Sequence, residues 1–298
     1  MDLREKKFGV IGASRGIGSW LVKFLRENGI QTHYTSKDKD TEFSSNRELV
    51  EKSDVVVLAV PIAFMEEVME EVYQHLEGKV LIDVCSVKQF LIEKYQSLKK
   101  LSPVDCSYLS IHPMFSQSIK SLEGQVFTFT FNDGVEIPFT ESFRKLLTDH
   151  MATIQDIDFI AHDKLMGVIQ GLNHFNLFVS AKTLARFAPN LEMVKNLSSP
   201  TYRIFIIFLT RYALQNPRLY ADIQMYNRYV KKVIELFKDE VDHLIQLIEH
   251  KDRQGFENYV TEMQPFFQGN EGDSAVSDHL IHQLGVYLEK ESSDNASK

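Results

Sequence analysis

The sequence predicts an α/β fold, with a doubly wound parallel sheet followed by an all-helical C-terminal domain. Up to about residue 158, short apolar runs alternate with amphipathic stretches, which is the pattern of βαβ units. A glycine-rich turn directly follows the first apolar run. From about residue 159 the alternation stops, and long stretches of helical periodicity replace it. We therefore expect two domains, at residues 1–158 and 159–298.

The first half contains short runs rich in β-branched or aromatic residues, and the most apolar of them are typical of parallel strands buried on both faces. The expected strands are Phe8–Gly12, Gln31–Thr35, Val55–Val60, Val80–Val84, Tyr108–Ile111 and Val126–Phe131. Apolar residues at helical spacing predict a helix around Trp20 and Leu25 that closes at Gly29, and a second helix at Ala63–Leu76.

The second half shows helical patterns and no strand pattern. The expected helices are Met166–Phe187, Thr201–Leu214, Tyr220–Ile248 and Gly255–Phe267. Their heavy apolar content predicts that helix packs on helix. The polar end, Glu291–Lys298, is expected to fray.

Composition excludes several classes of protein. A net charge of -8 argues against a general nucleic-acid binder, because neutralising phosphates needs an excess of Lys and Arg. The two cysteines, Cys85 and Cys106, form no disulfide framework and fit a reducing compartment. The N-terminus lacks the apolar core of a signal peptide, and no apolar stretch is long enough to span a bilayer. A cytoplasmic location is expected, without membrane or nucleic-acid partners.

The glycine-rich turn indicates a dinucleotide site. Glycines let the backbone turn tightly and approach a pyrophosphate, whose charge is met by N–H groups at the start of the following helix. The spacing here is G-x-x-x-G-x-G, in place of the common G-x-G-x-x-G. In a Rossmann-type domain the cofactor would be bound by this turn and by the end of the third strand. The expected cofactor-binding residues are Gly12, Ser14, Arg15, Gly16, Ile17, Gly18, Val60 and Pro61.

The end of the second strand bears on which cofactor is used. An NAD enzyme commonly places a carboxylate there to hold the ribose 2′-hydroxyl. Ser36 and Lys37 stand here instead, and with Arg15 they could meet the 2′-phosphate of NADP. Asp38 follows and could still serve NAD. The sequence thus favours NADP and leaves NAD open.

The turn also resembles the opening of short-chain dehydrogenases, whose Tyr-x-x-x-Lys spacing recurs at Tyr95 and Lys99. In that family the pair lies well beyond the fourth strand, much later than residue 95. An all-helical second half has no place in that single-domain fold either. This alternative is therefore a poor runner-up.

Four further segments occur in a fixed order along the chain. They are Ser86-Val87-Lys88, His112-Pro113-Met114-Phe115, His162-Asp163, and Ser198-Ser199-Pro200-Thr201-Tyr202-Arg203 followed by Arg211. With this set the chain resembles the prephenate dehydrogenases, which make 4-hydroxyphenylpyruvate on the route to tyrosine. The resemblance runs from about Phe8 to Phe267, and several unrelated motifs in the correct order are more specific than any one alone.

The resemblance implies roles for residues at strand ends. His112 would be the catalytic histidine that accepts the proton of the substrate's 4-hydroxyl, a task that suits a neutral imidazole. Ser86 would hydrogen-bond His112 or that hydroxyl, although a serine here could also cap the following helix. None of the histidines has metal-ligand spacing with cysteines or carboxylates, so no metal is expected.

The helical half would bind the substrate. Arg211 would hold the ring carboxylate of the prephenate dianion through paired hydrogen bonds, with Arg203 in the site or its supporting shell. Both could instead form interface salt bridges. On one continuous helix, His162, Gln170 and His174 would form a polar stripe facing the substrate, although His162 and Gln170 could equally make satisfied interior contacts.

Two departures from the family pattern leave alternatives open. Ser116-Gln117 stands where relatives commonly have Gly-Pro, so the substrate could be 4-amino-4-deoxyprephenate. Residues 1–7 leave no room for the chorismate mutase helices that some relatives carry, so a monofunctional enzyme is expected. A non-catalytic dinucleotide- or tyrosine-binding regulator is the remaining rival. The resemblance also implies a homodimer formed through the helical domain.

Overall fold

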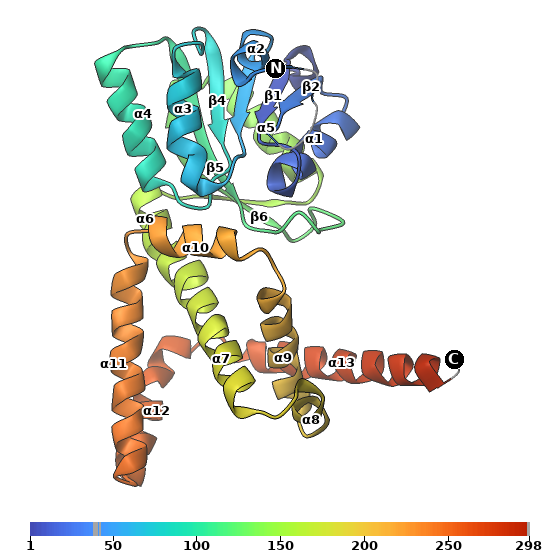
Figure 1. The fold of residues 1–298 in the computed structure, drawn as a ribbon, viewed down its shortest axis with the longest axis vertical. Helices are drawn as coiled ribbons and strands as arrows, with labels where there is room; N and C mark the ends of the chain where they lie inside the picture. The colour runs from blue at the N-terminus through green and yellow to red at the C-terminus, as the bar shows by residue number, and fades with distance from the viewer. Residues whose placement is uncertain (38–40, 42, 297–298) are drawn as a thin grey trace. The chain divides into compact units, whose positions relative to one another are not determined.

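The computed structural model describes residues 1–37, 41 and 43–296, in two compact units (Figure 1). The sheet unit consists of Met1–Ile169 and Arg218–Val230, and the helical unit of Gln170–Pro217 and Lys231–Lys298. The division differs from the expected one at residue 158. The first stretch of the sheet unit ends at Ile169, 11 residues after the expected boundary. The stretch Arg218–Val230 also belongs to the sheet unit.

The sheet unit is built on one seven-stranded sheet in the order β2-β1-β3-β4-β5-β6-β7. Its strands are β1 (Phe8–Ile11), β2 (Thr32–Thr35), β3 (Val55–Leu58), β4 (Lys79–Asp83), β5 (Cys106–Pro113), β6 (Val126–Asp133) and β7 (Thr153–Asp156). The first five strands are parallel, as predicted, whereas β6 pairs antiparallel with β5 and β7 is parallel to β6. The edge strand β7 was not predicted, because it is short and mostly exposed and so lacks an apolar run.

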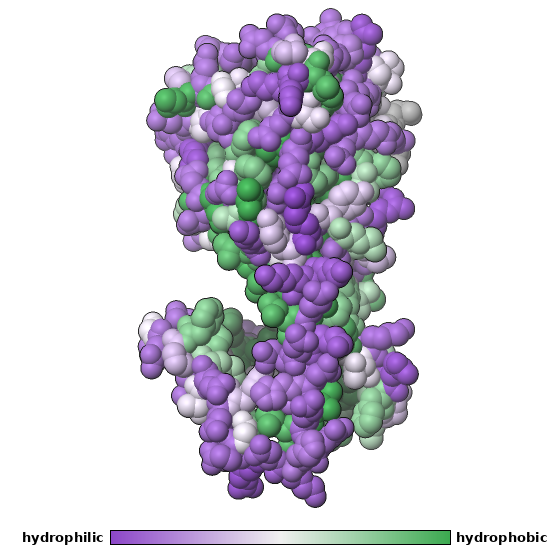
Figure 2. Space-filling model, turned by 90° about the vertical axis from the view of Figure 1, so that its left-hand side faces the viewer, coloured by the Kyte–Doolittle hydropathy of each residue, from purple (hydrophilic) through white to green (hydrophobic). Residues whose placement is uncertain are grey.

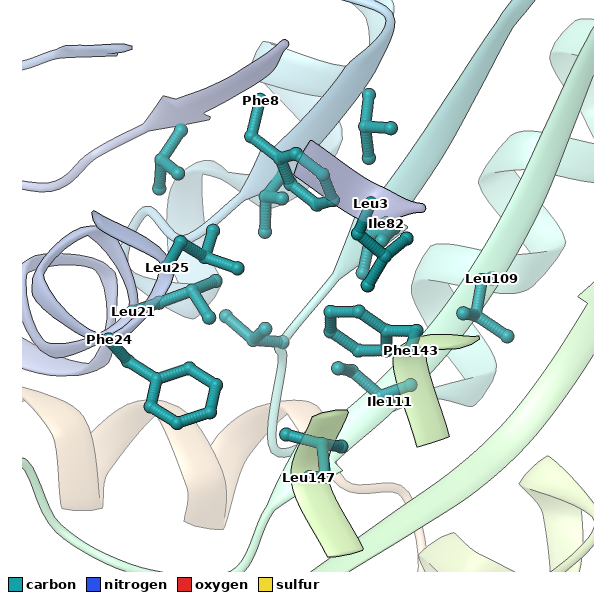
Figure 3. Packing of buried hydrophobic residues seen from close by; sticks show 14 of the residues in the cluster. Leu3, Phe8, Leu21, Phe24, Leu25, Ile82, Leu109, Ile111, Phe143 and Leu147 are labelled. Carbon is teal, nitrogen blue, oxygen red and sulfur yellow. The ribbon is translucent and has the colours of Figure 1, made fainter. Parts of the chain in front are cut away.

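Helices cover both faces of this sheet. They are α1 (Gly16–Glu27), α2 (Asn46–Glu51), α3 (Met65–Tyr73), α4 (Gln89–Leu101), α5 (Ile137–Asp149), α6 (Phe159–Met166) and α10 (Pro217–Tyr226). On one face, Leu25 of α1 and Phe143 of α5 pack with Phe8 of the sheet (Figure 3). On the other face, Met69 and Leu91 of α3 and α4 complete a second buried cluster. The central strand β3 is buried along its whole length, which explains its run of β-branched residues.

The helical unit contains helices only, among the residues that the structure describes. They are α7 (Asn173–Phe187), α8 (Leu191–Asn196), α9 (Pro200–Ala213), α11 (Val230–Glu249), α12 (Arg253–Phe267) and α13 (Gly272–Ala296). α9 packs against both α7 and α13. In the described chain no helix is both long and apolar enough to cross a bilayer.

Two expectations about the helices were wrong. The expected helix Tyr220–Ile248 is two helices, α10 and α11, because the Asn227 side chain accepts a hydrogen bond from the Tyr229 backbone N–H (2.9 Å) in the turn between them. The expected helix Met166–Phe187 is interrupted by a π-helical segment, η3 (Gly167–Leu172). The polar end Glu291–Lys298 belongs to α13 up to Ala296, and its last two residues lie outside the described residues.

Candidate active site

The glycine-rich turn has the backbone that a dinucleotide site needs. Gly12 and Gly16 have φ values of +92° and +70°, which disfavour any residue with a side chain. A Cβ on Gly12 would lie 2.7 Å from Cγ1 of Val60, and one on Gly18 would lie 2.7 Å from the Gly12 carbonyl oxygen. The three glycines are therefore fixed by backbone conformation and close packing.

The turn also lies at the position in the sheet where ligands bind. It joins β1 to α1, and the strand order reverses between β1 and β3, whose carboxyl ends meet here. α1 begins at Gly16, and its N-cap residue Arg15 makes no capping hydrogen bond with its side chain. The residues Ser14, Ile17, Val60 and Pro61 lie in this turn, in the first turn of α1 or directly after β3. The arrangement fits a bound pyrophosphate.

No carboxylate lies at the first two positions after β2. Ser36 is half-buried, and Lys37 is exposed with its Nζ 5.6 Å from the centre of the Phe64 ring. Asp38, the candidate ligand for an NAD ribose, lies outside the described residues. The described part of this edge therefore offers positive charge and hydrogen-bonding groups.

His112 lies within β5, close to its carboxyl end, opposite Thr128 of β6. Its side chain is 2% exposed. The Nδ1 atom of His112 lies 3.0 Å from Nε2 of His162, and Nδ1 of His162 lies 2.9 Å from a carboxylate oxygen of Asp163. Sequence reasoning placed His162 among the substrate ligands, whereas here its side chain is fully buried and both ring nitrogens bond to protein groups.

Asp163 also caps the start of α4. Its carboxylate accepts hydrogen bonds from the backbone N–H groups of Lys88 (3.0 Å) and Gln89 (2.8 Å). The suggestion that Ser86 caps this helix was wrong, because the helix begins later and Asp163 of α6 supplies the cap. Ser86 lies half-buried in the loop between β4 and α4. A carboxylate at this end of a helix is stabilised by the helix dipole.

A buried ion pair lies beneath this end of β5, and sequence reasoning did not find it. The Lys88 ammonium is 2.7 Å from the Asp83 carboxylate, and both side chains are fully buried. Lys88 also donates to the carbonyl of Ile111, and the Tyr108 hydroxyl donates to Asp83 (2.7 Å). The only signal in the sequence was Lys88 itself, at the end of the Ser86-Val87-Lys88 segment five residues after β4. The network holds the backbone next to His112.

Burial governs the charge of these histidines. It lowers the pKa of His112 well below the ordinary range, and the nearby His162 and Lys88 lower it further. Burial also lowers the pKa of His162, although the hydrogen bond to Asp163 opposes this shift. A neutral imidazole at His112 can accept a proton at neutral pH.

The remaining candidates belong to the helical unit. Arg203 is half-buried and Arg211 exposed on α9, and neither forms a salt bridge within the described chain. The His174 ring lies 5.3 Å from that of Tyr212, and burial lowers the pKa of His174 to about 4. Gln170 is half-buried in η3. The π-helical segment interrupts the single α-helix on which the polar stripe of His162, Gln170 and His174 was expected.

Tyr95 and Lys99 have a structural role. The buried Tyr95 hydroxyl donates to the Asp133 carboxylate (3.0 Å), and Lys99 pairs with the same group. Burial raises the pKa of Tyr95, which keeps the phenol neutral. The pair ties α4 to the end of β6. The short-chain dehydrogenase alternative is therefore rejected.

Two family models match the chain. The nucleotide-binding domain of prephenate dehydrogenase matches residues 23–135, and the dimerization domain of prephenate dehydrogenase matches residues 160–262. Among solved structures, a prephenate dehydrogenase from A. aeolicus in complex with hydroxyphenyl propionate and NAD+ superposes with a TM-score of 0.67. That alignment has 21% identity and covers 87% of this chain and 96% of the other. It shows a shared fold.

Sequence relatives agree with these matches. A probable arogenate/prephenate dehydrogenase of Methanocaldococcus jannaschii is 31% identical over 94% of this chain and 66% of its own length. The T-protein of Haemophilus influenzae is 30% identical over 88% of this chain and 67% of its own length. The chain thus spans about two thirds of the length of these relatives. The ordered motifs, the fold and both halves of the sequence agree that the chain belongs to the prephenate dehydrogenase family.

Proposed function

We propose that the chain is an NAD(P)-dependent oxidoreductase that converts prephenate to 4-hydroxyphenylpyruvate by oxidative decarboxylation. The observation that supports it best is His112, a buried neutral imidazole near the carboxyl end of β5, with its Nδ1 bonded to His162. With Nδ1 as the donor in this bond, Nε2 is the nitrogen that can accept a proton. This is what the oxidation of a secondary alcohol requires of a protein base.

The mechanism assigns separate tasks to the two units. In the sheet unit, the turn from Gly12 to Gly18 holds the pyrophosphate, and His112 Nε2 accepts the 4-hydroxyl proton. In the helical unit, Arg211 binds the ring carboxylate, with Arg203, His174 and Gln170 as further substrate ligands. A bound nicotinamide would supply the acceptor for the hydride that leaves C4 of the substrate. The ring carboxylate leaves as carbon dioxide, and its bonding electrons complete the aromatic ring. The proton held by His112 then returns to the phenolate oxygen, so these residues mainly align the reactants and hold one proton.

Ser86 would orient the 4-hydroxyl. It lies in the loop after β4, one strand away from His112 in the sheet, and its side chain is half-buried. The described residues leave its hydroxyl without a bond to His112 or to any other side chain. A hydroxyl in this position can donate to, or accept from, the substrate.

We also propose a homodimer formed through the helical unit. The matched family model is described as a dimerization domain. Large apolar side chains of this unit reach the surface, where apolar areas interrupt the polar ones (Figure 2). They include Leu236, Ile248, Phe256, Met263, Phe266 and Leu280. Exposed apolar surface of this kind commonly marks a protein interface.

The deciding experiment follows the absorbance of reduced nicotinamide with prephenate, arogenate and 4-amino-4-deoxyprephenate, each tested with NAD and with NADP. We expect turnover with prephenate and either cofactor. If only arogenate or only 4-amino-4-deoxyprephenate is turned over, that compound is the substrate in place of prephenate. If dinucleotide binds but none of the six combinations turns over, the chain is a non-catalytic regulator.

A further inference from the structure

His112 is linked to a second histidine and a carboxylate in an unbroken row of hydrogen bonds. The row runs from His112 Nδ1 to His162 Nε2 (3.0 Å), and from His162 Nδ1 to Asp163 Oδ1 (2.9 Å). The side chains of His162 and Asp163 are 0% and 1% exposed. All three residues belong to the sheet unit, so the row does not depend on how the two units are arranged.

Donors and acceptors can be assigned along this row by exclusion. The Asp163 carboxylate already accepts backbone N–H groups at the start of α4, and it has no proton to donate while ionised. His162 Nδ1 must therefore carry the hydrogen in its bond to Asp163. In a neutral imidazole the other nitrogen is then an acceptor, so His162 Nε2 accepts from His112 Nδ1.

The surroundings hold this arrangement in place. Asp163 is fixed by α4, and the Asn227 side chain donates to the backbone carbonyl of Asp163 (2.8 Å). On the side of β5, the Lys88–Asp83 pair holds the carbonyl of Ile111, directly before His112. Among the described residues, the charged groups that act on the two histidines include Asp83, Lys88 and Asp163.

We propose that His162 and Asp163 are positioning residues that keep His112 in the tautomer protonated on Nδ1, so that Nε2 accepts the substrate proton. When that proton arrives, His112 becomes a cation in a buried place. His162 accepts its Nδ1–H bond, and the Asp163 carboxylate, bonded to His162, supplies a counter-charge in the same row. The logic is that of a catalytic triad in which a carboxylate orients a histidine, with one more histidine between them. The inference rests on the proposed function of His112.

The first test needs no turnover. In protein labelled with ¹⁵N-histidine, ring-nitrogen correlation spectra of the full chain report which nitrogen of each imidazole carries hydrogen, and comparison with His112→Asn assigns the His112 signals. We expect the Nδ1–H form at His112 in the wild type and a shift towards the Nε2–H form in His162→Leu. An Nε2–H form at His112 in the wild type would overturn the inference, even if the enzyme is active.

The second test separates positioning from structural support. His162→Leu should lower kcat by about 10²-fold with the KM for the dinucleotide unchanged. His162→Gln, whose amide oxygen can still accept from His112, should recover most of that loss. In a His112→Asn background, His162→Leu should cost nothing further, because no tautomer remains to be set. Equal losses in both backgrounds would make His162 merely structural.

The two hypotheses can fail independently. If the wild type turns over none of the substrates but shows the Nδ1–H form at His112, the proposed function fails and the tautomer assignment stands. If the wild type turns over prephenate and the double-variant cycle is additive, the function stands and the positioning role fails. Should His162→Leu not fold, the wild-type spectrum and the His162→Gln kinetics still decide.

Discussion

Lys88 and Asp83 form an ion pair at 2.7 Å in which neither side chain is exposed to solvent. Removing one partner from such a pair leaves an uncompensated charge in the core, which costs about 3–5 kcal/mol. Lys88→Met should therefore lower the free energy of unfolding by that amount in urea titrations. The matched control is Lys94→Met, which breaks the more exposed pair with Glu70 and should cost less than about 1 kcal/mol. Equal losses of unfolding free energy in Lys88→Met and Lys94→Met would contradict the conclusion that the Lys88–Asp83 pair is buried.

His112→Asn tests the base. It should lower kcat by about 10²–10⁴-fold, because the amide cannot accept the proton, while dinucleotide affinity measured by fluorescence titration stays the same. His282→Asn, an exposed histidine of α13, serves as the control and should change neither quantity. A His112 variant within a few-fold of wild type would remove this residue from the mechanism.

Arg211→Ala tests substrate anchoring. The loss of a charge-assisted contact to the ring carboxylate should cost about 1.5–3 kcal/mol, which raises the KM for prephenate about 10- to 150-fold. Arg186→Ala removes an exposed arginine from α7 of the same unit and should leave KM unchanged. An unaltered KM in Arg211→Ala would assign this residue a structural role.

Cofactor choice can be tested at the edge after β2. With Ser36 and Lys37 at this edge, NADP should be used at least as well as NAD. Ser36→Glu should reverse the order, because a carboxylate binds the ribose diol and repels the 2′-phosphate. The measurement is the ratio of kcat/KM for the two cofactors, with Ser97→Glu on the exposed side of α4 as the control. A wild type that prefers NAD tenfold or more would point to Asp38 as the ribose ligand.

Stability should fall in mild acid because of His174. Its pKa is about 4 in the folded protein, against about 6.5 in an unfolded chain, so the unfolded state binds more protons between these values. The contribution of His174 to the free energy of unfolding is fully present above pH 6.5 and is lost as the pH falls towards 4. Between pH 7 and pH 5 this loss amounts to about 2 kcal/mol. In urea titrations at both pH values, His174→Phe should reduce the wild-type difference by this amount. His282→Phe, the exposed control, should leave it unchanged.

Local patterns were enough to predict the strands that are buried on both faces. β3 and β4 appear in the sequence as nearly continuous apolar runs, and the turn after β1 carries its glycines at positions that only glycine fits. β7 was missed because an exposed edge strand needs no apolar run. The break between α10 and α11 at Asn227 was missed because it depends on side-chain hydrogen bonds of Asn227. The spacing of apolar residues gives no information about these bonds.

The site was predictable where its motifs are local, and not where it depends on distant pairing. His112 and the glycine turn were identified from short segments. The row from His112 to Asp163 joins residues 50 positions apart, and the cap of α4 joins residues 74 positions apart, so neither spacing is visible along the chain. The helical wheel placed His162 on one stripe with Gln170 and His174 because it assumed an uninterrupted α-helix, whereas η3 changes the period between them.

The sheet unit is assembled from two stretches separated by residues 170–217, and this has a consequence for biosynthesis. On the ribosome, Asn227 and Tyr229 emerge only after that whole intervening stretch. Until then the carbonyl of Asp163 and the side chain of Gln89 lack the partners that these two residues supply. The contacts from Asn227 and Tyr229 that support the surroundings of Asp163 therefore form late in translation. A fragment ending at residue 169 would expose this corner to proteases, although it contains every strand of the sheet.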